Sequence, residues 1–181
     1  MRPDHNNKRA FSLVELVIVI VILGIIAAVA IPRITSGSRN AGESALRANL
    51  ASIRNAIDWY YGEHNNVFPG VNDAGGGFGG ANSEDALKNQ LVKYTKSDGT
   101  VSDSVDPAFP YGPYLRGNFP ALPVGSNAGN NAVKMVAKAG PVVDGDTDAT
   151  AGWIFNSTTG EFKANLTTSE VANDGTAYLD F

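Results

Sequence analysis

The sequence predicts an α+β fold in which a long, bent N-terminal helix packs, through its C-terminal half, on a small antiparallel β-sheet. Three observations predict this fold. Residues 11–31 form an almost uninterrupted apolar run, residues 46–60 carry apolar side chains at helical spacing, and residues 152–166 alternate apolar and polar side chains around a turn. A helix with one apolar face needs a surface to bury it, and a sheet at the end of the chain can supply that surface.

The composition excludes several classes of function. The 181 residues carry 14 Lys+Arg and 18 Asp+Glu, a formal net charge of -4, and the length is typical of one domain with or without an appendage. The chain has no cysteine and two histidines, which excludes disulfides, thiolate metal sites, cysteine nucleophiles and multi-histidine metal sites. An acidic chain lacks the basic face that binds phosphates, so we expect no nucleic acid partner.

The apolar run of residues 11–31 has one charged side chain, Glu15, and one other polar side chain, Ser12. As a helix it would be about 31 Å long, the thickness of the hydrocarbon core of a bilayer. Arg2, Lys8 and Arg9 precede the run. The positive-inside rule therefore predicts a single membrane span with its N-terminus in the cytoplasm and the rest of the chain exported.

Glu15 is the unusual residue of this run, because a carboxylate inside a bilayer is costly. One explanation is that Glu15 lies near the lipid headgroups or is protonated. The other is that it meets a positive group on another chain, for which a free α-amine at the same depth is the obvious candidate. That pairing requires cleavage between Ala10 and Phe11, so that the chain begins at Phe11.

The segment KRAFSLVELVIVIVILGIIAAVAIP, residues 8–32, resembles the N-terminus of type IV prepilins and type II secretion pseudopilins. The family pattern is a short basic leader, cleavage before Phe, and a long apolar run that contains a Glu and ends at a Pro. Phe11, Glu15 and Pro32 match the first mature residue, the acidic residue and the proline of that pattern. The chain departs from the pattern at Ala10, where the family usually has Gly.

The resemblance implies that an aspartic prepilin peptidase removes the leader, residues 1–10, and methylates the amine of Phe11. It implies a structural rather than enzymatic role in a homo-oligomeric filament with other pilin-like subunits, assembled on an inner-membrane platform. The expected location is the bacterial inner membrane, with the C-terminal part periplasmic or extracellular. In the filament, Phe11, Glu15 and Pro32 are the expected assembly residues.

Three roles are compatible with these features. Because the chain has no cysteine, no disulfide closes a C-terminal loop of the kind that many adhesive pilins carry. This absence favours a type II secretion pseudopilin over a type IV pilin of a surface pilus for adhesion, motility or DNA uptake. The third role is a monomeric binding protein that uses the N-terminal helix as a membrane anchor.

Residues 11–32 are the membrane and filament-core half of the helix. The ring of Pro32, the last residue of this half, predicts that the helix kinks or ends there. The helical pattern then resumes, so residues 33–64 are predicted to be an amphipathic second half that stops near Gly62. The apolar stripe of this half consists of Leu46, Leu50, Ile53, Ile57 and Tyr60.

Residues 65–131 are predicted to connect this helix to the sheet. The region contains glycine-rich and proline-rich loops and one short helix, residues 83–94, which begins at the N-cap Ser83. The aromatic, proline-rich stretch 109–125 is expected to pack as an ordered arm, and carbohydrate binding is the less favoured interpretation.

Residues 132–181 are predicted to form the antiparallel sheet. Residues 132–138 indicate one strand, and residues 152–166 indicate a hairpin whose turn lies at 156–160. The last five residues are expected to add an edge strand.

Asp144, Asp146 and Asp148 are the candidate metal ligands, because alternating carboxylates around a glycine are ligands that Ca²⁺ uses. The resemblance adds that major secretion pseudopilins hold calcium in a C-terminal loop, although the residues of that loop do not match here one by one. A solvated acidic turn is the alternative that the residues favour. His64, at the helix end, is expected to cap the helix as a positive group rather than to catalyse. Trp59, Tyr60 and Tyr61 are expected to pack against the sheet.

Overall fold

The computed structural model describes residues 12–181, and of residues 29–36 it describes the helical backbone. The chain divides into two compact units, Met1–Asn40 and Ala41–Phe181. A helix of 51 residues, α1 (Leu13–Glu63), supplies the described part of the first unit and continues into the second. The long N-terminal helix is therefore confirmed over the described residues, and its backbone stays helical at Pro32.

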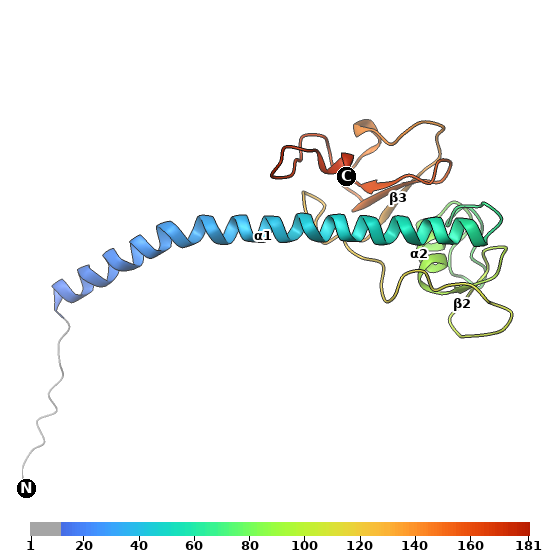
Figure 1. Cartoon of the computed structure of the whole chain (residues 1–181), viewed down its shortest axis with the longest axis horizontal. Coiled ribbons are helices and arrows are strands. Elements are labelled where there is room, and N and C mark those ends of the chain that lie inside the picture. Colours follow the sequence, from blue (N-terminus) through green and yellow to red (C-terminus); the bar gives the residue numbers. More distant parts are fainter. Residues whose placement is uncertain (1–11) are drawn as a thin grey trace, which may run out of the picture. The chain divides into compact units, whose positions relative to one another are not determined.

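The second unit is α+β, as expected (Figure 1). After α1 come the helix α2 (Glu84–Val92) and a two-stranded antiparallel pair, β1 (Tyr94–Thr95) and β2 (Val101–Ser102). A three-stranded sheet follows, built from β3 (Val133–Val136), β4 (Trp153–Asn156) and β5 (Phe162–Ala164). There are also two short 3-10 helices: η1 (Asp144–Asp146) lies between β3 and β4, and η2 (Tyr178–Asp180) follows β5.

The apolar stripe of the second half of α1 forms the centre of the core. Its five residues, Leu46, Leu50, Ile53, Ile57 and Tyr60, are each at most 2% exposed. They belong to one cluster with Trp153 and Phe155 of β4 and Phe162 of β5. The helix thus buries its stripe on one face of the sheet, which confirms the packing that the spacing predicts.

The hairpin prediction is confirmed. Strands β4 and β5 pair antiparallel, with Phe155 opposite Phe162. The backbone N–H of Gly160 donates to the carbonyl oxygen of Asn156 at 2.8 Å, and Gly160 has φ +79°, a conformation that favours glycine. The predicted turn at 156–160 is therefore the turn of the structure.

The sheet is not wholly antiparallel, so this part of the prediction is wrong. Strand β3 pairs parallel to β4, with Val133 opposite Trp153. A parallel pair needs a crossover of a dozen or more residues, and the connection 137–152 has that length. Because residues 137–152 contain no helix pattern, the sequence gives no sign that this connection crosses from one end of the sheet to the other.

The second face of the sheet is covered by the end of the chain. Ile154 of β4 packs with Val142 and Leu179, all at most 2% exposed. Leu179 lies in η2, so the last residues form a 3-10 turn and not the expected edge strand. Burial of Tyr178 and Leu179 accounts for this conformation, because a 3-10 turn allows consecutive side chains to point to different surfaces.

The connecting region is irregular but well packed. The hydroxyl oxygen of Ser83 accepts from the backbone N–H of Ala86 at 3.2 Å, which confirms it as the N-cap of α2. The proline-rich stretch places Leu115, Phe119 and Leu122 in the main core, so packing is confirmed for this arm.

Arg54 ties α1 to two distant parts of the chain. Its guanidinium donates to the carbonyl oxygen of Phe162 from Nε at 3.0 Å and from Nη2 at 2.8 Å. Nη1 donates to the carbonyl oxygen of Phe181 at 2.6 Å. Five donors in a planar fork make arginine suited to such a double contact.

Candidate functional site

The N-terminus of α1 carries a capping arrangement that includes Glu15. The backbone N–H of Ser12 donates to Oε2 of Glu15 at 2.9 Å, and the backbone N–H of Val14 donates to the hydroxyl of Ser12 at 3.3 Å. The Glu15 contact is the half of an S-x-x-E capping box in which the acid reaches back to the N-cap, while the Ser12 hydroxyl accepts at the second helical position instead of the third. It holds the Glu15 carboxylate at the positive end of the helix dipole. That Ser12 caps the helix was not predicted from the sequence, although a serine three residues before a glutamate is the sequence pattern of such a cap.

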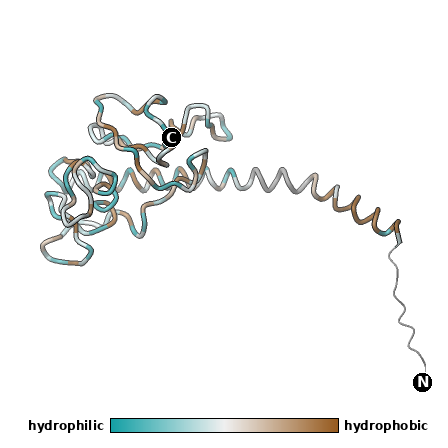
Figure 2. The backbone as a smooth tube through the Cα atoms, turned by 180° about the vertical axis from the view of Figure 1, so that it is seen from behind, coloured by the Kyte–Doolittle hydropathy of each residue, from teal (hydrophilic) through white to brown (hydrophobic). Residues whose placement is uncertain are grey.

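The side chains that follow Glu15 form an exposed apolar surface. The large apolar residues from Leu13 to Ile26 are each 44–78% exposed. Figure 2 shows this concentration of hydrophobic residues in the N-terminal part of α1. Exposed apolar surfaces of this extent mark sites of association with another protein or with a membrane.

Within the part of the chain that the structure describes, no helix has both the length and the apolar character needed to cross a membrane.

The other predicted processing and assembly residues are not tested by the geometry. Ala10 and Phe11 lie outside the described residues, and so does the side chain of Pro32. Of the predicted assembly residues, the structure describes the surroundings of Glu15 alone.

The three candidate calcium ligands lie on the connection between β3 and β4, and each contacts a different protein group. Asp148 pairs with Lys134 at 2.7 Å, and Asp146 pairs with Lys138. Oδ1 of Asp144 accepts from the backbone N–H of Thr168 at 2.8 Å. Asp146 and Asp148 thus already have lysine partners while they stay partly exposed, and calcium binding at these residues stays a prediction.

His64 is buried at the end of α1, with 1% of its surface exposed. Its Nδ1 lies 2.8 Å from the carbonyl oxygen of Tyr60, which can only accept, so Nδ1 carries the proton. Its ring stacks on the Tyr60 ring at 3.7 Å between centroids. Burial lowers the pKa of His64 and favours the neutral ring, against two backbone hydrogen bonds and the charges of Glu63 and Asp98 that raise it. The ring therefore caps the helix, as expected, but as a neutral group.

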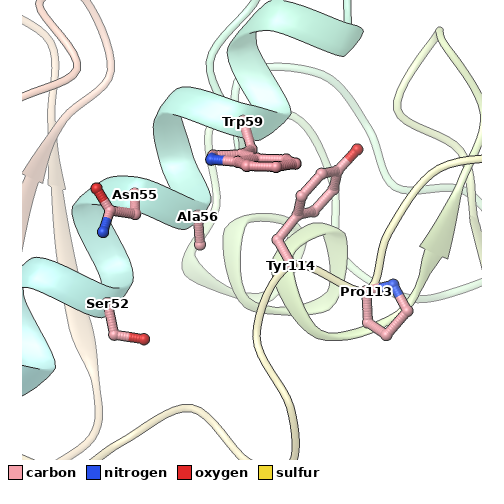
Figure 3. A pocket seen from close by; sticks show the side chains of 6 residues that line it. All are labelled: Ser52, Asn55, Ala56, Trp59, Pro113 and Tyr114. Carbon is pink, nitrogen blue, oxygen red and sulfur yellow. The ribbon is translucent and has the colours of Figure 1, made fainter.

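A groove of about 350 Å³ lies on the second half of α1 (Figure 3). Ser52, Asn55 and Trp59 project into it from the helix, and Pro113 and Tyr114 face them from the proline-rich arm. Trp59 is 69% exposed, so the expectation that it packs on the sheet is wrong. Since helix positions 57 and 60 already face the core, position 59 points away from it. Among the described residues that line the groove there is no carboxylate, histidine or cysteine, and hence no acid–base pair.

Comparison with known proteins finds one family match and one similar protein, each over part of the chain. Residues 5–31 match the family described as the prokaryotic N-terminal methylation motif. A similar protein is the type II secretion system core protein G of Escherichia coli strain K12, 29% identical over 55 residues. That match covers 30% of this chain and 38% of the relative, so the chain spans well under half the length of the curated relative. No solved structure gives a significant match.

Proposed function

We propose that this chain, a type IV pilin or pseudopilin by its N-terminal methylation motif, is a structural subunit of a pilus-like filament. Proteins of this family are structural and have no enzymatic activity. The observation that carries the proposal is the exposed apolar surface of α1, which begins beside a single carboxylate, Glu15. Helices of this kind bury their apolar surfaces against one another when subunits associate.

Before assembly, the same surface would anchor the chain in the bacterial inner membrane. The run of residues 11–31 supports this anchor, and the basic residues of the leader support a cytoplasmic N-terminus. The second unit, with its own core, would then be periplasmic or extracellular.

Processing supplies the partner that Glu15 needs. A prepilin peptidase would cut between Ala10 and Phe11 and leave a methylated amine on Phe11. The Glu15 carboxylate uses Oε2 for Ser12, and a carboxylate has further lone pairs that can accept from the amine of a neighbouring subunit. Such a charge pair would fix the axial register of the subunits more than it would stabilise them.

Within this class we favour a type II secretion pseudopilin. The similarity to core protein G and the absence of cysteine support this choice. A type IV pilin of a surface pilus is the second candidate, and a monomeric membrane-anchored binding protein is the third. The filament candidates require other pilin-like subunits and an inner-membrane assembly platform as partners.

The variant Glu15→Ala tests filament assembly. We expect it to be cleaved normally but to give few or no filaments in sheared fractions viewed by electron microscopy. The matched control is Asp58→Ala, which removes an exposed carboxylate from the same helix and should assemble normally. Normal filaments from Glu15→Ala would contradict the proposal and favour the anchored monomer.

The intact mass of the native protein, measured in sheared surface material and in membranes, distinguishes the candidates. A chain that begins at methylated Phe11 in the sheared material would identify a surface pilin. The same chain found in membranes alone would favour a short secretion pseudopilus. A chain that keeps residues 1–10 in both fractions would mean that Ala10 blocks processing.

A further inference from the structure

Two lysines form ion pairs with carboxylates of the connection between β3 and β4, residues 137–152. Lys134 lies in β3, and Lys138 follows four residues later, just beyond the end of the strand. The Nζ of Lys134 lies 2.7 Å from a carboxylate oxygen of Asp148, and Lys138 pairs with Asp146. Two of the three carboxylates that suggested a calcium ion therefore already have a cationic partner from the same sheet edge.

Both lysines act on carboxylates that are hydrogen-bonded a second time. The backbone N–H of Val143 donates to Asp146 at 2.8 Å, and the backbone N–H of Thr150 donates to Asp148 at 2.8 Å. The hydrogen bond from Lys134, followed by those from Thr150, lowers the pKa of Asp148 well below its ordinary value. The carboxylates are thus ionised and locally satisfied at neutral pH.

Two asparagines fill the interior of the same region. Asn165 is fully buried, and its Nδ2 donates to the carbonyl oxygens of Asp148 at 3.0 Å and Ala151 at 2.9 Å. The Nδ2 of Asn127 lies 2.9 Å from the Asp148 carbonyl, 3.0 Å from that of Ala151 and 2.6 Å from that of Asn165. Three backbone carbonyls thus converge on side-chain amide nitrogens. In calcium-binding proteins, carbonyls that converge in this way bind the cation.

These contacts do not fit a calcium ion. Ca²⁺ takes six to eight oxygen ligands, which must converge on one point. Among residues 12–181 as described, no group of three or more His, Cys, Asp or Glu side chains is arranged to hold a metal. The carbonyls that could add ligands face the N–H groups of Asn127 and Asn165 instead.

We infer that contacts of Lys134, Lys138, Asn127 and Asn165, here called the lock, hold residues 127–165 in place without a divalent cation. The resemblance to secretion pseudopilins suggests calcium in this part of the chain. The ammonium groups supply the positive charge, and the amides supply the donors to the converging carbonyls. The inference concerns the folding of the second unit and holds whether or not the chain forms filaments.

Thermal unfolding of the full chain in detergent tests the lock. Samples are stripped with EDTA and compared with samples in excess CaCl2, using circular dichroism, with equilibrium dialysis against CaCl2 as a direct measure of binding. We expect the same Tm in both samples and no stoichiometric calcium. A filled site at a hundredfold excess over its Kd would raise Tm by about 5–10 °C in a chain of this size, and such a rise would overturn the inference.

The double variant Lys134→Met, Lys138→Met tests whether the two lysines stabilise this region. It should lower Tm in EDTA by several degrees more than Lys88→Met, a control that removes an equally partnered lysine from α2, where it pairs with Glu84 at 3.1 Å. A double variant as stable in EDTA as the control would overturn the inference.

Discussion

The Nε2 atom of His64, at the end of α1, lies 2.9 Å from Oγ1 of Thr95 in β1. Because Nδ1 of the ring donates to the Tyr60 carbonyl, Nε2 is the acceptor and the Thr95 hydroxyl donates. A protonated ring would have to donate at both nitrogens inside a buried site. The contact therefore joins the helix to the first strand in the neutral form of the histidine.

This geometry predicts that stability falls with acidification through the ordinary histidine range. Burial lowers the pKa of His64 below its usual 6.5, so at pH values just under 6.5 the unfolded chain binds the proton more readily than the folded chain. The stability that the neutral ring contributes is complete above pH 6.5 and is lost as pH falls through that value toward the lower pKa of the folded state. Urea unfolding of the full chain between about pH 7.5 and pH 5 measures it.

His64→Gln should flatten this pH profile, although it should also lower stability at pH 7.5. The carboxylates with shifted pKa values, among them Asp98 and Asp148, have pKa values lowered from 3.8, so they titrate below the window. A profile that keeps its slope in His64→Gln would assign the dependence to another group.

Truncation of the two tryptophans should lower stability by very different amounts. Trp153 is fully buried and its Nε1 donates to the carbonyl oxygen of Pro120 at 2.8 Å, whereas Trp59 is 69% exposed. Trp153→Ala should cost about 3–5 kcal/mol of unfolding free energy, and Trp59→Ala less than about 1 kcal/mol. Chemical denaturation measures both, and the second variant is the control for the first. A larger loss for Trp59→Ala would show that its groove is part of the core.

Removal of the Asn165 side chain should be among the most damaging polar substitutions. Asn165→Ala leaves the buried carbonyl of Ala151 with one donor fewer and the N–H of Asp148 without its acceptor at 3.1 Å. We expect a loss of about 2–4 kcal/mol in urea unfolding. Asn118→Ala, which removes an exposed amide, should change stability by less than about 0.5 kcal/mol. Equal effects of the two variants would contradict the assignment of a structural role to Asn165.

Gly160 and Gly117 form a matched pair for the hairpin turn. Both have positive φ, +79° and +84°, but a Cβ on Gly160 would lie 2.3 Å from the Phe68 ring, while a Cβ on Gly117 would meet nothing within 4 Å. Gly117→Ala should cost about 1 kcal/mol for the backbone conformation alone. Gly160→Ala should cost about 2–4 kcal/mol, because the clash adds to it. Thermal or urea unfolding of both variants measures the difference, and equal losses would mean that Phe68 moves aside freely.

Much of the fold follows from local patterns. The stripe from Leu46 to Tyr60, the cap at Ser83 and the turn at 156–160 are each determined by residues close together in the sequence, and each is confirmed. The parallel pairing of β3 with β4 depends on the path of residues 137–152, which contain no periodic pattern. That path could not be predicted from alternation, because alternation defines faces and not strand direction.

The candidate sites divide in the same way. Glu15 stands out in the sequence because charge is rare in an apolar run. The amides of Asn127 and Asn165 give no such signal, because they lie 38 residues apart and asparagine is ordinary in loops. The pairing of Lys134 with Asp148 likewise depends on tertiary structure, so the acidic residues were visible in the sequence and their partners were not.

Arg54 has a mechanical consequence for any process that pulls on α1. Its guanidinium donates hydrogen bonds to the backbone of β5 at Phe162 and, at the same time, to the backbone of Phe181. Tension applied along the second half of the helix would therefore reach β5 and the end of the chain directly, through these hydrogen bonds, without first straightening the glycine-rich loops. The second half of α1 and β5 would therefore bear load together.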